Sequence, residues 1–286
     1  MTGADPILHR QVMRVLRTRR DWLYLICRTF AALMALLAIA APVLTLHDPN
    51  ATDLGAALTG PSPAHLLGAD AAGRDTLSRL VASAGTSLLG PIAVVVFSTV
   101  AGVLVGVTAG WLGGWPDTLL SRAAELLLAF PALLVAIIFV ALYGTGVTAP
   151  VIALSLAYLP YVSRLARNLT LSERRRPYLA AYRVQGFSGL TICLRHLIPN
   201  IAPVVLAQSS VNFGYALLDL SALAYLGLGV PPLTPTWGSM INDGQSALLQ
   251  GHPLSALLPC AAIVLTVVAF NVVAEHWADQ VSRRPA

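Results

Sequence analysis

Long apolar stretches separated by short polar segments dominate the pattern along the chain. The first covers 23–46 and is interrupted only by Arg28, which is near enough to its start for the guanidinium to reach the lipid headgroups. A charge-free run covers 80–116, and 88–112 within it suffices for one helix across a bilayer core of ~30 Å. A second charge-free run, 126–163, is too long for one such helix.

A turn divides this second run into two helices. Gly144–Gly146, followed by Pro150, combines the residues that most often interrupt regular structure. Two further apolar stretches follow at 197–218 and 253–274. The pattern therefore predicts an all-α fold with six transmembrane helices.

Composition agrees with this pattern. Apolar residues make up 56% of the chain and charged residues 11%, against about 25% charged in an average soluble protein. Such a chain cannot cover a water-facing surface, so an ordinary soluble enzyme is excluded and a multi-pass membrane protein is expected.

Arginine is distributed unevenly between the two sides of the membrane. The segment 164–199 carries seven arginines against one acid, Glu173, and the N-terminal tail is also rich in arginine. The segment after the first helix holds more aspartates than arginines. The positive-inside rule then places both termini and 164–199 in the cytoplasm. The predicted organisation is a cytoplasmic tail (1–22), a first helix (23–46), an extracytoplasmic loop (47–86), a five-helix core (87–280) with its cytoplasmic loop 164–199, and a cytoplasmic tail (281–286).

The absence of lysine removes whole mechanisms. All 18 basic residues are arginine, so the chain has no P-loop lysine to hold nucleotide phosphates. No His-Glu-x-x-His motif is present, and the three cysteines are too scattered to imply a disulfide or metal framework. We expect a protein that is not an enzyme and holds no metal; any ATP hydrolysis would belong to another chain.

The cytoplasmic loop contains a helical apolar stripe. Leu190, Leu194 and Leu197 recur at i, i+4 and i+7, with arginines beside them. One interpretation is a membrane-surface helix whose basic residues only satisfy the positive-inside rule. The other is a docking helix offered to a cytoplasmic partner.

A resemblance to a known family favours the docking interpretation. The frame Ala180–Gly186 followed by His196–Pro199 resembles the signature loop of ABC-importer permeases, in which Glu-Ala-Ala precedes a glycine and then Ile-x-Leu-Pro. Other segments resemble the C-type permeases of dipeptide, oligopeptide and nickel importers: His65–Asp70, Gly73–Leu80, Leu128–Pro131, Arg195–Asn200, Tyr225–Val230, Pro235–Gly238 and Ala269–Asn271.

The resemblance implies a type I importer permease in the plasma membrane of a prokaryote. Such a chain forms half of a pathway for di- or oligopeptides, beside a homologous second permease. Two cytoplasmic ATPases bind ATP and Mg, an extracytoplasmic binding protein delivers substrate, and neither a cofactor in this chain nor nucleic acid is involved. A nickel or other small-solute importer and, in a different class, a stand-alone channel or secondary transporter are the alternatives.

The same resemblance supplies a candidate ATPase-coupling surface. The signature glutamate is absent, because its position holds Ala180, and Tyr182 replaces the second alanine. Gly186 is expected to form a turn, and the Arg174–Arg176 cluster is expected to face acidic residues of the ATPase. The candidate coupling residues are Ala180, Ala181, Tyr182, Arg183, Gly186, Leu190, Leu194, Arg195, His196 and Pro199.

Other candidates lie within the membrane. Asp219 is the one acid near the membrane interior, which suggests either a functional group or an interface acid that already reaches water. With Asn271 and Pro131 it is a candidate for the pathway or gate. Gly102, Gly106 and Gly110 form two small-xxx-small steps, which favour close helix packing within the chain over a seam between subunits.

Overall fold

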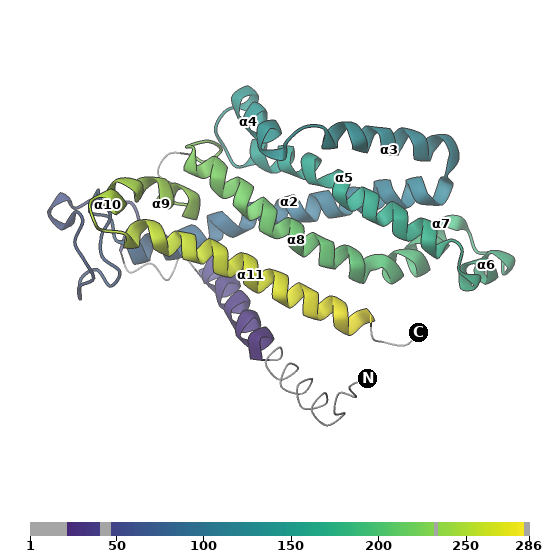
Figure 1. Ribbon diagram of the computed structural model, residues 1–286, viewed down its shortest axis with the longest axis horizontal. Helices are drawn as coiled ribbons and strands as arrows, with labels where there is room; N and C mark the ends of the chain where they lie inside the picture. Colours follow the sequence, from purple (N-terminus) through teal and green to yellow (C-terminus); the bar gives the residue numbers. More distant parts are fainter. Residues whose placement is uncertain (1–21, 41–46, 232–233, 283–286) are drawn as a thin grey trace, which may run out of the picture.

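The computed structural model describes residues 22–40, 47–231 and 234–282 (Figure 1). Most of the two predicted cytoplasmic tails lies outside these ranges, which include only Trp22, 281 and 282 of them. The last part of the first predicted span, 41–46, also lies outside. In the described ranges the chain is helical, and its β-structure is confined to one isolated bridge between Ala69 and Asp75. The elements are a first helix (Trp22–Ala40), η1 (Leu54–Ala56), α2 (Thr76–Leu112), α3 (Gly114–Leu128), α4 (Ala132–Tyr143), α5 (Thr148–Glu173), α6 (Pro177–Val184), α7 (Gly189–Ile192), a π-helical turn (Cys193–Leu197), α8 (Ile198–Tyr225), α9 (Trp237–Asp243), α10 (Gln245–Leu249) and α11 (Leu254–Ser282).

Five stretches of the described chain are long and apolar enough to cross a membrane. They are the first helix, α2, α5, the continuous segment Gly189–Tyr225 and α11. The pair α3 and α4, bent by 82°, makes a sixth if it counts as one span. The bend falls at Pro131, which has an extended backbone and no amide hydrogen to continue the helix. The predicted six-helix fold is confirmed on that count, and the turn predicted at Gly144–Gly146 separates α4 from α5.

Two helices begin earlier than the hydropathy pattern indicates. α3 begins at Gly114, ahead of the second charge-free run 126–163, although Asp117 interrupts the apolar pattern there. The charge of Asp117 is balanced inside the fold, because Arg167 of α5 donates to it at 2.7 Å (Nη2 to Oδ2). α2 begins at Thr76, inside the segment predicted as a loop, because the carboxylate of Asp75 caps it by accepting from the Ser78 amide at 2.8 Å.

The helices form an elongated bundle (Figure 1). The arginine-rich segment with α6 and α7 lies at one end, and α9, α10 and the acidic loop after the first helix lie at the other. The predicted topology requires this separation. Tyr24 stacks on His276 at 3.8 Å between ring centroids, so the start of the first helix lies against the last part of α11. Which end faces the cytoplasm remains a prediction.

Close backbone approach joins α2 to α5. A Cβ atom added to Gly106 would lie 2.3 Å from the carbonyl oxygen of Ser163. At Gly102 and Gly110 it would meet the Cβ atoms of Val162 and Thr170 at 2.7 and 2.9 Å. All three glycines therefore face α5 of the same chain, which is how small residues bring membrane helices together.

An ionic cluster joins the acidic loop to α9. Asp70, a buried residue, accepts hydrogen bonds from Arg74 at 2.7 Å and from Arg79 at 2.8 Å. The same two arginines donate to Asp243 at 2.8 and 2.9 Å. Two carboxylates and two guanidinium groups thus neutralise one another where loop, α2 and α9 meet.

Candidate functional site

The predicted cytoplasmic loop is almost entirely helical. α5 continues to Glu173, α6 and α7 follow, and the π-helical turn leads into α8 without a break. This coupling segment, residues 174–200, stands at the end of the molecule opposite α9 and α10 (Figure 1).

Gly186 ends α6 in the manner that its sequence position suggests. Its φ of 82° lies in the left-handed region, which glycine adopts without steric cost. Its amide donates to the carbonyl of Arg183 at 3.0 Å, and the Phe187 amide donates to that of Tyr182 at 3.1 Å. These two bonds form a Schellman cap, and the Tyr182 and Phe187 rings complete it with an edge contact. The docking helix itself begins later, at Gly189, with Ser188 as its N-cap.

Four apolar side chains lie exposed around this turn. Val184 is 89% exposed, Leu190 71%, Leu194 54% and Phe187 41%. We call these four residues the apolar tip. An exposed apolar cluster of this kind at the end of a molecule is typical of a docking surface.

The apolar stripe expected on this helix is divided. Leu197 is fully buried, whereas Leu190 and Leu194 belong to the tip. The cause is the π-helical turn Cys193–Leu197, which has more residues per turn than an α-helix and rotates Leu197 toward the core. The sequence pattern missed Val184 and Phe187 because they lie outside the helical period.

The three consecutive arginines do not face outward together, contrary to the prediction. Arg174 donates to the carbonyl oxygen of Gly110 at 2.7 Å and thereby caps the C-terminal end of α2. Arg176 pairs with Glu173 at 2.9 Å. Arg183 lies over the ring of Trp111, 4.7 Å from its centroid, and is exposed like Arg195. The arginines thus divide between internal contacts and the rim of the tip.

Glu173 joins three helices at the base of the coupling segment. This buried carboxylate accepts from the Tyr178 hydroxyl at 2.7 Å and from the Asn200 side-chain amide at 2.8 Å. Burial, with the hydrogen bond to Glu173, raises the pKa of Tyr178 to about 12. In the sequence, Glu173 is distinguished only as the one acid beside the seven arginines of 164–199.

The signature positions themselves are placed around this base. Ala180 and Ala181 are exposed on α6, so the position of the missing glutamate faces outward. Tyr182 stacks on His196 at 3.8 Å between centroids, which fixes α6 on the π-helical turn. Pro199 is exposed just after the π-helical turn, where its missing amide hydrogen interrupts the hydrogen-bond ladder of the continuous helix.

The pathway candidates lie on separate elements. Asp219 is on α8, Asn271 on α11 and Pro131 at the break between α3 and α4, and no hydrogen bond within the described residues connects them. Asp219 instead accepts from the Tyr158 hydroxyl of α5 at 2.8 Å.

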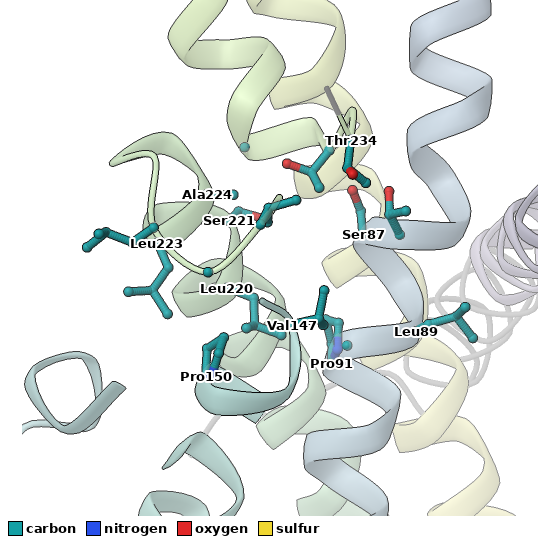
Figure 2. A pocket seen from close by; sticks show the side chains of 17 residues that line it. Ser87, Leu89, Pro91, Val147, Pro150, Leu220, Ser221, Leu223, Ala224 and Thr234 are labelled. Atoms are coloured by element: carbon teal, nitrogen blue, oxygen red, sulfur yellow. The ribbon is translucent and has the colours of Figure 1, made fainter. Parts of the chain in front are cut away.

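A cavity of about 210 Å³ opens near the end of α8, a feature that the sequence did not indicate. Figure 2 shows its side chains coming from α2, from the α4–α5 connection and the start of α5, from α8 and from the loop that follows α8. The lining is mainly apolar, with hydroxyl groups of Thr86, Ser87, Ser221 and Thr236 among it.

Comparison with known proteins identifies the family of this chain. Residues 102–286 match the model of the family described as binding-protein-dependent transport system inner membrane component. The chain belongs to this family. It is a multi-pass permease subunit of an ABC importer of the peptide and nickel group, as the sequence resemblance indicated, and the channel or secondary-transporter alternative is not retained.

Several relatives are similar over most of their length. The dipeptide transport system permease protein DppC of Alkalihalophilus pseudofirmus is 35% identical over 85% of this chain and 80% of its own. The nickel transport system permease protein NikC of Escherichia coli is 32% identical over 90% and 93%. The glutathione transport system permease protein GsiD of Pectobacterium atrosepticum is 34% identical over 87% and 83%.

A solved structure shares the fold. The crystal structure of an amino acid ABC transporter with histidines matches with a TM-score of 0.53 over 71% of this chain and 94% of that one. At 14% identity this similarity concerns the fold alone.

Proposed function

We propose that this permease forms half of the translocation pathway of an ATP-driven importer for short peptides in a prokaryotic plasma membrane. Its partners would be a homologous second permease, two cytoplasmic ATPase subunits that bind ATP and Mg, and an extracytoplasmic binding protein. The names of DppC and GsiD, a dipeptide and a glutathione permease, support a substrate with peptide bonds.

The single observation that carries the proposal is that the apolar tip is exposed while the coupling segment beneath it is held by the hydrogen bonds of Glu173. The four side chains of the tip are exposed, while Glu173 ties the base to the end of α5 and the start of α8. A partner that takes up the tip and moves it would therefore pull on α5 and α8 together. These two helices also carry Tyr158 and Asp219 and border the cavity, so movement of the ATPases would reach the pathway as a shift of packed helices.

The test is uptake by the complete importer in proteoliposomes, with two variants of Gly186. Both Gly186→Ala and Gly186→Trp strain the left-handed backbone equally, but the indole alone adds bulk where no heavy atom lies within 4 Å of a Cβ. We expect Gly186→Ala to retain most ATP-dependent uptake of a labelled dipeptide. Gly186→Trp should reduce it by about tenfold, the equivalent of ~1.4 kcal/mol of lost docking. Equal uptake by both variants would mean that this surface lies on the membrane and docks nothing.

Nickel is the second candidate substrate, because NikC is 32% identical over 90% of the chain. The same proteoliposomes distinguish the two when supplied with radioactive Ni²⁺ instead of dipeptide. We expect peptide uptake without Ni²⁺ uptake; the reverse result would replace the peptide proposal.

A further inference from the structure

Four polar and aromatic side chains lie on neighbouring turns where α5 packs on α8. Tyr158 and Tyr161 lie one turn apart on α5, and Tyr215 and Asp219 lie one turn apart on α8. Tyr158 donates to Asp219 at 2.8 Å, and its ring centroid is 6.1 Å from that of Tyr161. Tyr215 is placed beside this pair by its position one turn before Asp219 on α8. We call these four residues the Asp219 patch.

The patch opens away from the chain's own core. Tyr158 is 7% exposed, but Tyr161 is 51% and Tyr215 57% exposed, and Asp219 is half-buried. Among the residues that the structure describes, no arginine or histidine pairs with Asp219, whose hydrogen bond comes from Tyr158. The Asp219 carboxylate therefore has one phenol and no cation as its partner within the described residues.

The Asp219 carboxylate lies on the membrane-spanning helix α8 and faces the membrane-spanning helix α5. An ionised side chain facing lipid is costly, and such residues almost always face a water-filled cavity or a partner. Polar residues also continue along the same face of α8, where Gln208 and Asn212 precede Tyr215 and Asp219 at helical spacing. The Gln208 amide donates to Asn212 at 3.2 Å, and the Asn212 amide nitrogen has no partner in the described part of the chain. Asn212 is only 3% exposed, so the polar face of α8 runs from the exposed Tyr215 into the interior of the bundle.

The donor set selects the kind of ligand. A carboxylate forms strong charge-assisted hydrogen bonds with an ammonium group, and tyrosine rings attract organic cations through their faces. A nickel ion prefers nitrogen ligands such as imidazole, whereas the patch offers one carboxylate and three phenols. A substrate carboxylate would be repelled.

We propose that the Asp219 patch binds the protonated amine of the substrate, the N-terminal ammonium of a peptide, during its passage between the two permease subunits. This inference rests on the proposed function. It makes Asp219 a specificity-determining residue of the pathway, with the exposed rings of Tyr161 and Tyr215 surrounding the ammonium group.

The experiment uses the complete importer in proteoliposomes, with saturating binding protein and a labelled dipeptide whose amino group is free. Asp219→Asn should raise the KM for uptake about tenfold or more, as expected for loss of a charge-assisted hydrogen bond, and Asp219→Glu should restore most of it. Tyr161→Phe keeps the ring and should resemble wild type, whereas Tyr161→Leu should raise KM. Glu125→Gln on α3, which removes an exposed carboxylate elsewhere, is the matched control and should change nothing.

Two measurements separate the possible failures. If Asp219→Asn dissociates the permease pair in size-exclusion chromatography, Asp219 is an interface ion-pair residue and the inference is overturned. An unchanged KM in an intact complex overturns it as well, while wild-type peptide uptake leaves the proposed function standing. If the wild-type complex takes up no peptide, both fail together.

Discussion

Glu173 lies at the end of α5 and accepts hydrogen bonds from Tyr178 of α6 and Asn200 of α8. Its carboxylate therefore contributes more to the stability of the coupling segment than the exposed charged side chains around it. In this family the signature loop begins with a glutamate, and here that position holds the exposed Ala180. The internal brace of the coupling segment is therefore supplied from the end of α5, before α6 begins.

Replacing this carboxylate tests the brace. Glu173→Gln removes the charge from a buried acceptor of hydrogen bonds from Tyr178 and Asn200, and we expect a loss of about 1.5–3 kcal/mol of stability. Hydrogen exchange in residues 177–200 should accelerate, and the thermal midpoint in nanodiscs should fall. Glu125→Gln serves as the exposed control. Unaltered exchange in 177–200 would show that the aromatic stack of Tyr182 on His196 alone holds the segment.

At the scale of elements, the pairing of α2 with α5 depends on the absence of side chains. Gly106→Ala places a methyl group 2.3 Å from the Ser163 carbonyl, so backbone must move, and we expect a loss of about 1–3 kcal/mol. Gly90→Ala on the same helix has the flexible end of Leu220 at 3.0 Å as its nearest contact and should cost less. Thermal unfolding in nanodiscs compares the two. A larger loss at Gly90 would mean that α2 and α5 do not pack as described.

The ionic cluster at the other end fixes the acidic loop to α9. Asp70→Asn leaves Arg79, whose side chain is 5% exposed, without its buried partner, and such losses cost about 3–5 kcal/mol. Limited proteolysis should then cut the segment 47–75 faster than in wild type. Asp48→Asn, an exposed substitution in the same loop, should leave the cleavage rate unchanged. Equal rates for the two variants would assign the loop's rigidity to other contacts.

For the whole molecule, the absence of lysine leads to a prediction about energy coupling. The purified permease should hydrolyse no ATP by itself, because it has no P-loop lysine to hold the phosphates. Phosphate release should appear only when partner ATPases are added. Hydrolysis by the permease after removal of all co-purifying ATPase would contradict the proposed division of labour.

Features formed by neighbours in sequence could be predicted, whereas features that depend on contacts between residues far apart in the chain could not. The turn at Gly186 is predictable because glycine commonly ends a helix in the left-handed conformation. The Schellman cap that it forms involves only residues that are neighbours in sequence. The early start of α3 was missed because Asp117 is balanced by Arg167, which is distant in the chain. The division of the leucine stripe was missed because a π-helical turn leaves no clear mark in a hydrophobic pattern.

The sequence by itself determined that this protein lies in a membrane, that it is helical with about six spans, and that it lacks the lysine of a nucleotide site. These properties are sums over local residues, since transfer of a helix into lipid depends on its own side chains. Only the tertiary structure decided that Glu173 meets Tyr178 and Asn200, that Arg174 caps α2, and that Asp219 lies beside Tyr158. A polar group in a membrane protein acts through its partner, and helix packing selects that partner from residues far away in sequence.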